Sequence, residues 1–211
     1  MRLAYLREVP TLVEERMLAA QGYLRVAGID EVGRGPLAGP VVAAAVILPQ
    51  NFNAPWLGLV RDSKQLTGAT REFLYQHICE TALSVGVGLC DSLLIDKRGI
   101  VASTRLAMAQ AVSQLEPPAE SLLVDYVSLP EVRLPQKAIT HGDGLCLSIA
   151  CASIVAKVTR DHLMVGFDEV YPGYGFRNHK GYGTPEHFRC LQRLGPCPIH
   201  RRSFQPVKSM V

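Results

Sequence analysis

The segment Val41–Leu48 reads VVAAAVIL, and it is the feature that most restricts how this chain can fold. A strand with one face in water alternates apolar and polar residues, whereas this run is apolar at every position. Such a strand is covered on both faces, and in α/β proteins the cover is helical. We therefore expect a sheet with helices on both sides.

Patterns on either side of this run supply the other elements. Thr11 to Ala20 is predicted to be a helix in which Thr11 is the N-cap and Glu14 completes a capping box. Apolar periodicity predicts strands at 24–30, 84–90, 121–126 and 137–141, and helices at 70–83, 102–115, 145–170 and after Thr184. This order indicates an α/β fold with a mixed sheet. We expect one domain over residues 1–211, with about 172–211 as a C-terminal extension packed on it.

Composition excludes several classes of protein. A chain of 211 residues that is 48% hydrophobic and 19% charged can bury a core and is not of the disordered class. Its formal charge of +3 is compatible with a polyanionic partner but is equally common without one. Residues 1–22 lack the apolar core of a secretory signal, and no apolar run is long enough to span a membrane. The six cysteines show no paired spacing, which favours reduced, mostly buried thiols over structural zinc. We expect a cytoplasmic protein.

Four acidic residues stand where predicted strands end. Asp30 and Glu31 end the first strand, Asp125 lies near the end of the fourth, and Asp143 follows the fifth. Open α/β sheets usually build their sites at such strand ends. Converging carboxylates repel one another unless cations lie between them, and an all-oxygen set favours Mg²⁺ or Mn²⁺ over zinc. Two such ions can stabilise both the attacking and the leaving oxygen of a phosphoryl displacement.

The same acids have a plainer interpretation as caps and turn residues, and the spacing alone does not exclude it. Adjacent strand residues also point to opposite faces of a sheet. Asp30 and Glu31 could therefore share one site only if the strand end were irregular, which Gly33 and Gly35 would allow.

Gly33-Arg34-Gly35 is a glycine-rich turn that leads into a strand. A dinucleotide-binding loop would need a helix there, so this interpretation is weak. A tight turn whose backbone N–H groups approach a sugar or phosphate fits better. In a second loop, Ser63 and Lys64 offer a hydroxyl and an ammonium group.

The C-terminal region mixes basic and aromatic residues. Positive charge gathers around Tyr174 and Tyr182, and it comes from Arg177, His179, Lys180, Arg201 and Arg202. Cations can meet phosphates while rings stack on sugars or bases, but a solvated basic surface with half-buried tyrosines fits equally well. Histidines outside any metal-binding spacing are interpreted as structural or surface residues: His141, His162, His187 and His200.

Ordered sequence blocks give the chain a resemblance to the ribonuclease HII family. The blocks are GIDEVGRGPLAGPVVAAAV at 28–46, DSKQLT at 62–67, VDY at 124–126, GD at 142–143, ASIVAKVTRD at 152–161, HKGYGTPEH at 179–187 and HRRSFQPV at 200–207. They cover roughly residues 22–207, which is nearly the whole chain.

The resemblance implies a ribonuclease H-like fold, a five-stranded mixed sheet flanked by helices with a C-terminal helical extension. It places the catalytic, metal-binding acids at Asp30, Glu31, Asp125 and Asp143, and it implies two Mg²⁺ or Mn²⁺ ions, both bridged by Asp30. The substrate contacts that it implies are the turn Gly33, Arg34 and Gly35 on the ribose 2′-hydroxyl, Tyr182 on the sugar, and Ser63 and Lys64 on phosphate.

The implied substrates are RNA–DNA hybrids and duplex DNA with single embedded ribonucleotides, as in ribonucleotide excision repair. Cleavage 5′ of the ribonucleotide would leave a 3′-hydroxyl and a 5′-phosphate. We expect a monomer with no membrane partner. The chain departs from the family pattern at Tyr126, which is usually a small residue, and at Ser148 and Ala150, where a Pro-Glu pair and an earlier serine are common nearby.

Three alternatives compete with this interpretation. The sister family, ribonuclease HIII, carries a long N-terminal extension that we do not expect here. A silent hybrid-binding protein on the same fold has no reason to gather four carboxylates against phosphates. A nucleotide-using transferase would need a P-loop lysine after the glycine turn, and none follows Gly35.

Overall fold

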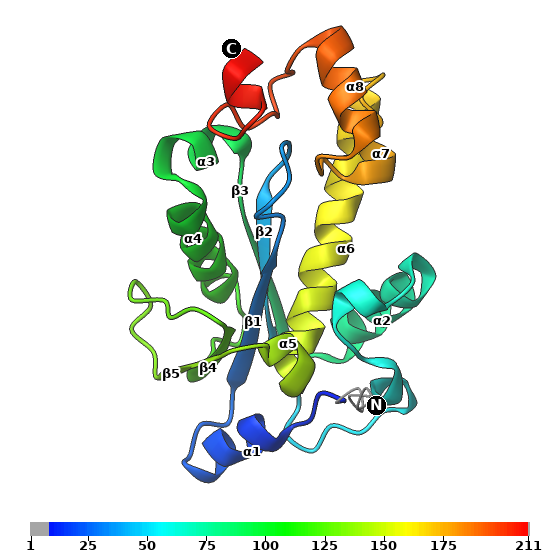
Figure 1. Ribbon diagram of the computed structural model, residues 1–211. Helices are drawn as coiled ribbons and strands as arrows, with labels where there is room; N and C mark the ends of the chain where they lie inside the picture. Colours follow the sequence, from blue (N-terminus) through cyan, green and yellow to red (C-terminus); the bar gives the residue numbers. More distant parts are fainter. Residues whose placement is uncertain (1–8, 211) are drawn as a thin grey trace, which may run out of the picture.

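A five-stranded sheet in the order β3-β2-β1-β4-β5 organises the computed structural model, which describes residues 9–210 (Figure 1). β2 pairs antiparallel with β1 and β3, whereas β4 pairs parallel with β1 and β5. The mixed sheet expected from the sequence is therefore confirmed. Its strands are β1 Val26–Val32, β2 Val41–Ile47, β3 Ser84–Cys90, β4 Ser121–Asp125 and β5 Gln136–Ile139.

Helices cover both faces of this sheet. α4 (Ile100–Ser113) lies on one side and α6 (Leu147–Val170) on the other (Figure 1). Every residue of β2 is buried, because alternate side chains enter two different hydrophobic clusters: Ala43 packs on the α4 side and Ala44 on the α6 side. The expectation drawn from VVAAAVIL is confirmed.

Shorter elements complete the fold. They are α1 Val13–Ala20, η1 Pro55–Leu59, η2 Ser63–Gln65, α2 Gly68–Thr81, α3 Ser92–Arg98, α5 Gly142–Leu145, α7 Phe176–His179, α8 Pro185–Leu194 and η3 Val207–Met210. α7 and α8 lie near the C-terminal end of α6, whereas the red segment that contains η3 lies above α3 in this view (Figure 1). The Thr184 side chain caps α8 by accepting from the His187 amide at 3.2 Å, as expected.

The capping box expected at the first helix is wrong. α1 begins at Val13, and its N-cap Leu12 makes no side-chain cap. Thr11 instead forms a β-bridge: its N–H donates to the Leu145 carbonyl at 2.9 Å, and its carbonyl accepts from the Leu147 amide at 3.0 Å. Glu14 pairs with Lys137 at 2.6 Å. Tertiary pairing therefore replaces the local cap, which pattern reading cannot foresee.

The sequence patterns also missed α3, which precedes α4. The Asp91 side chain caps this helix by accepting from the Leu94 amide at 2.8 Å. α3 has only seven residues, too few for helical periodicity to stand out.

The described cysteines match their prediction. All six are free, four are buried, and only Cys79 is exposed. Within residues 9–210, no helix is both long enough and apolar enough to cross a membrane.

Candidate active site

Parallel pairing brings the predicted acids together at one end of the sheet. β1 and β4 run side by side with Ile29 opposite Val124, so the next residues, Asp30 and Asp125, are neighbours. β5 lies beside β4, and the turn after it leads into α5, which carries Asp143. Acids far apart in sequence thus meet because the carboxyl ends of parallel strands share an edge.

Asp30 is the most buried of these acids, with 5% of its surface exposed. Its Oδ1 accepts from the Glu31 amide at 2.7 Å. Burial, followed by the charge of Glu31, holds the pKa of Asp30 well above its usual range, although a hydrogen bond from Ser153 opposes this. A carboxylate in this setting is costly to ionise without a cation nearby.

Glu31 does not sit at an irregular strand end, contrary to one possibility raised above. β1 stays paired with β2 through Val32, so Glu31 leaves the strand on the face opposite Asp30. Burial raises the pKa of Glu31, Arg34 at 3.4 Å opposes the shift, and the charge of Asp125 adds to it. The charge of Asp125 therefore acts on Glu31 although β1 is regular at this residue.

Asp125 and Asp143 are connected through one backbone amide. The Gly142 N–H donates to Asp125 Oδ1 at 2.7 Å, which holds the start of α5 against the end of β4. Burial raises the pKa of Asp143, and the charges of Asp62 and Asp125 add to the shift. Lys64 Nζ, 3.9 Å from Asp143 Oδ2, is the cation beside it.

The donors are suited to a hard divalent cation. The four acids offer only oxygen, the ligand that Mg²⁺ and Mn²⁺ prefer. Within residues 9–210, no three acidic, histidine or cysteine side chains are already drawn together as a ligand cluster. Burial, and after it the charges of neighbouring carboxylates, raises the pKa values of Asp30, Glu31 and Asp143, and bound cations would offset both costs.

The predicted phosphate contacts, Ser63 and Lys64, lie beside the acids in different environments. Lys64 leaves 81% of its side chain exposed. Ser63 is buried, and its hydroxyl lies 2.9 Å from that of Ser153, the residue that hydrogen-bonds Asp30. The Ser63 hydroxyl therefore lies behind Asp30 rather than on the open surface.

The glycine turn is tight at one end and open at the other. Gly33 has a φ of +92°, and a Cβ there would lie 2.3 Å from Nε of Arg160. Gly35 is exposed, and a Cβ there would meet nothing within 4 Å. The fold itself thus requires glycine at 33 but not at 35, which leaves free space for a ligand above Gly35.

The basic surface expected around Tyr174 and Tyr182 is partly wrong. Tyr182 is 40% exposed, but Tyr174, His179 and Arg201 are buried, with Arg201 at 0% exposure. The sequence pattern counted these cations as surface charge because it cannot show which side chains the extension folds inward.

Buried histidines form a hydrogen-bonded relay behind Tyr182, as the structural interpretation of His187 and His200 predicted. His187 Nδ1 must donate to the Tyr182 carbonyl at 2.9 Å, so its Nε2 accepts from His200 Nε2 at 3.0 Å. His200 Nδ1 then accepts from the Cys197 amide at 2.9 Å. Each ring is neutral and fully partnered in this arrangement.

This relay predicts an acid-sensitive fold. Burial lowers the pKa of both His187 and His200 to about 4, below the ordinary value near 6.5. The contribution of these two histidines to the free energy of unfolding is therefore fully present above about pH 6.5 and is lost as the pH falls toward 4, because the rings of the unfolded chain take up protons first. Protonating the first of the two rings in the folded protein reduces the free energy of unfolding by roughly 3 kcal/mol. Urea unfolding at pH 7 and 4.5 measures the loss. His200→Gln should reduce this pH dependence, and exposed His162→Gln should not.

Lys64 supplies a second prediction. Burial alone would lower its pKa, but the surrounding carboxylates, Asp62 first and then Asp143, raise it, so the group stays charged. If Lys64 contacts a phosphate, Lys64→Ala should weaken binding to every duplex alike and reduce the salt slope of log K by about one unit. Lys97→Ala, an exposed lysine on α3, is the control. An unchanged slope in Lys64→Ala would place this lysine outside the interface.

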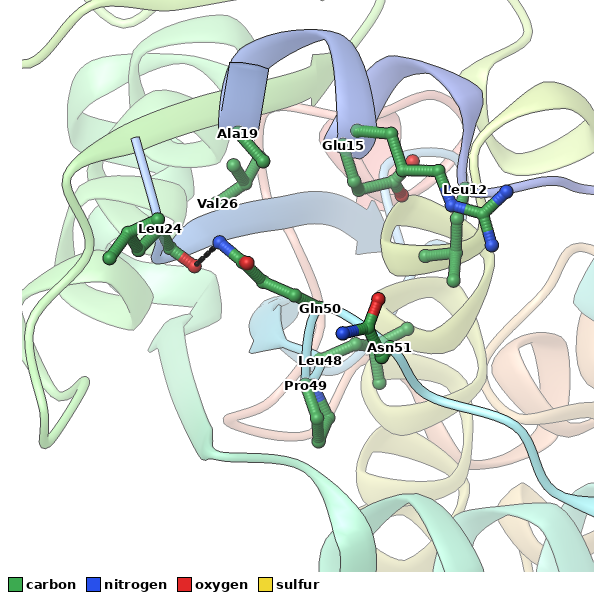
Figure 2. Close-up of a pocket in the computed structure, with 10 residues that line it drawn as sticks. Leu12, Glu15, Ala19, Leu24, Val26, Leu48, Pro49, Gln50 and Asn51 are labelled. Atoms are coloured by element: carbon green, nitrogen blue, oxygen red, sulfur yellow. Dashed lines mark hydrogen bonds between the residues drawn. The ribbon is translucent and has the colours of Figure 1, made fainter. Parts of the chain in front are cut away.

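A partly open pocket of about 200 Å³ lies away from the acids (Figure 2). α1 forms one wall, with Glu15 and Ala19, and the segment Leu48–Asn51 faces it; Gln50 reaches across to donate to the Leu24 carbonyl. None of the predicted site residues lines this pocket. The acids instead lie at the ends of β1 and β4 beside Lys64, whose side chain is 81% exposed. A large ligand at the surface can approach that lysine without entering an enclosed pocket.

Comparison with known proteins agrees with this geometry. A family model described as Ribonuclease HII matches residues 27–207. A Ribonuclease HII of Dehalococcoides mccartyi is 55% identical over 201 residues, which is 95% of this chain and 95% of the relative. A Ribonuclease HII of Geobacter metallireducens is 52% identical, covering 93% of this chain and 91% of the relative.

The fold is also similar to that of a solved structure. The ribonuclease H2 of Pyrococcus horikoshii superposes with a TM-score of 0.75 at 26% identity, covering 88% of this chain and 96% of that one.

Proposed function

The chain belongs to the ribonuclease HII family, and we propose that it hydrolyses RNA at the acidic end of its sheet with two divalent cations. As a member of this family it is an endonuclease that cleaves RNA in RNA–DNA hybrids and at ribonucleotides embedded in DNA. The observation that carries the proposal is the meeting of Asp30, Asp125 and Asp143 through β1, β4 and α5.

The proposed catalytic and metal-binding residues are Asp30, Glu31, Asp125 and Asp143. Asp30 and Asp125 end neighbouring strands, and Asp143 is linked to Asp125 through the Gly142 amide. Glu31 follows Asp30 on β1, and the charge of Asp125 contributes to its raised pKa. Mg²⁺ or Mn²⁺ bound there would activate water and stabilise the leaving oxygen of the scissile phosphate. Asp125 Oδ1 is held by an amide, which fixes the direction of its second oxygen.

The proposed substrate contacts surround these acids. Lys64, exposed beside Asp143, would bind a phosphate, and Ser63 would hold the same loop through its hydroxyl contact with Ser153 at 2.9 Å. The turn Gly33-Arg34-Gly35 would hydrogen-bond the ribose 2′-hydroxyl, the one group that distinguishes the two sugars. Tyr182, 40% exposed, would pack against that sugar. Cleavage on the 5′ side would leave a 3′-hydroxyl and a 5′-phosphate.

A three-duplex assay tests this function. With Mg²⁺ or Mn²⁺ we expect cleavage of an RNA–DNA hybrid and of duplex DNA with one ribonucleotide, no cleavage of all-DNA duplex, and no product in EDTA. Binding without cleavage under every condition would favour the silent hybrid-binding protein. A requirement for several consecutive ribonucleotides would contradict recognition of a single 2′-hydroxyl.

Tyr182→Ala separates recognition from metal binding. The ring is no ligand, so Mn²⁺ binding should stay nearly unchanged while cleavage at a single ribonucleotide falls by about tenfold or more, the loss expected when one stacking contact is removed. Tyr171→Ala, which removes an aromatic outside the proposed site, is the control. Normal cutting of the single-ribonucleotide duplex by Tyr182→Ala would remove the tyrosine from the site.

A further inference from the structure

Two arginines, Arg160 of α6 and Arg201 of the C-terminal extension, are completely buried at 0% exposure. Arginine is almost never fully buried unless it is paired with an acid. Neither guanidinium group has a carboxylate oxygen within 4.0 Å in the part of the chain described, residues 9–210. Burial lowers the pKa of Arg160, and it lowers that of Arg201 to about 9. Burying these two guanidinium groups without a carboxylate partner costs desolvation free energy, and side-chain packing alone does not explain why the fold keeps them there.

The partners of Arg201 are the carbonyl oxygens of the glycine turn. Its Nη1 donates to the Arg34 carbonyl at 2.8 Å, and Nη2 donates to the Gly33 carbonyl at 2.5 Å. Nε and Nη2 also donate to the Gly39 carbonyl at 3.0 and 2.9 Å. One planar fork thus binds both ends of the segment that carries the turn, a geometry that a lysine cannot reproduce.

Arg160 binds the same segment from α6. Its Nε donates to the Pro40 carbonyl at 2.9 Å and its Nη2 to the Ala38 carbonyl at 3.1 Å. Its Nη1 donates to the Lys180 carbonyl at 3.0 Å, and the guanidinium carbon lies 5.8 Å from the centre of the Tyr182 ring. Arg160 therefore contacts both predicted sugar-recognition elements, the turn segment and the tyrosine.

We propose that Arg160 and Arg201 are positioning residues for ribose recognition. By binding the carbonyls of residues 33–40 from inside the protein, they hold the turn with its carbonyls inward and its amides toward the substrate. The carbonyl of one residue and the N–H of the next point in opposite directions because they share one planar trans peptide unit. The inward carbonyls of Gly33 and Arg34 therefore turn the amides of Arg34 and Gly35 outward. Arg201 comes from the C-terminal extension, which makes this extension part of the recognition site. The inference rests on the proposed reading of the 2′-hydroxyl by this turn.

The test compares affinity for two duplexes that differ in a single 2′-hydroxyl. Binding is measured in an Asp30→Asn background with Mg²⁺, so that neither duplex is cut. We expect Arg201→Met to reduce the preference for the ribonucleotide-containing duplex about tenfold, the size of one lost hydrogen bond. Arg201→Lys keeps the charge but not the fork, and it should lose much of the preference while staying folded. Arg160→Lys should behave in the same way.

Arg193→Met is the matched control, because Arg193 also belongs to the extension and donates to a backbone carbonyl, that of Gly173 at 3.1 Å. Arg193→Met should keep the same preference for the ribonucleotide-containing duplex as the Asp30→Asn protein without a second substitution. If Arg201→Met does not fold, Arg201→Lys decides the question. A folded Arg201→Lys with full preference, or one that weakens both duplexes equally, would overturn the positioning role alone. A parent protein that binds the two duplexes equally would overturn the proposed recognition and this inference together.

Discussion

Asp30→Asn is expected to reduce the cleavage rate at least about a thousandfold while the protein stays folded. Asparagine keeps the shape of the side chain but removes the charge proposed to hold both cations. Loss of a metal-centred stabilisation of the transition state is worth several kcal/mol, and each 1.36 kcal/mol is tenfold in rate. The assay is single-turnover cleavage of the single-ribonucleotide duplex with saturating Mg²⁺.

Although Asp30→Asn should lose activity, we do not expect it to lose thermal stability. The pKa of Asp30 is raised by burial and by Glu31, so the ionised group opposes folding at neutral pH. A neutral asparagine removes this repulsion, and we expect the melting temperature to stay level or rise. Asp161→Asn, which removes a carboxylate paired with Lys157 on α6, is the control and should keep full activity. Retention of more than about a tenth of the activity in Asp30→Asn would exclude Asp30 from the metal site.

The sequence predicted the parts of the fold that depend on local pattern. The apolar run of β2 indicated helices on both faces, and Thr184 followed by Pro185 indicated the start of α8. The first helix was placed correctly but its cap was not, because Thr11 pairs with residues 145–147, far away in the chain. Long-range backbone pairing leaves no local signal.

In the candidate site, too, the sequence pattern predicts some residues and misses others. Acids at the ends of apolar runs marked Asp30, Asp125 and Asp143, because strand ends meet at one edge whatever the loops between them. Arg160 and Arg201 lay within the family-like blocks, yet spacing could not reveal that their partners are backbone carbonyls. A sequence does not distinguish a buried arginine from a surface arginine, so its pattern predicts surface charge at Arg201, which is buried.

Replacing each of two glycines of the turn, Gly33 and Gly35, by alanine separates an effect on folding from an effect on function. Gly33 has a positive φ of +92°, and Cβ of alanine there would lie 2.3 Å from Arg160 Nε. Gly33→Ala should therefore destabilise the protein by about 1–3 kcal/mol from backbone strain, with further loss from the clash. Gly35 is exposed and open, so Gly35→Ala should fold with an unchanged melting temperature.

Gly35→Ala should nevertheless lose about a hundredfold in cleavage at a single ribonucleotide. The added methyl occupies the free space through which the sugar must approach the backbone, and a displacement of about 1 Å at the reacting phosphate can cost this much. Cleavage is measured against Gly144→Ala, another glycine whose Cβ would meet nothing within 4 Å. Since Gly144 follows Asp143, Gly58→Ala in η1 is a second, more distant control with the same open space. If Gly35→Ala cuts as fast as both controls, the ribose does not approach this turn, and the 2′-hydroxyl must be read elsewhere even if the metal site stands.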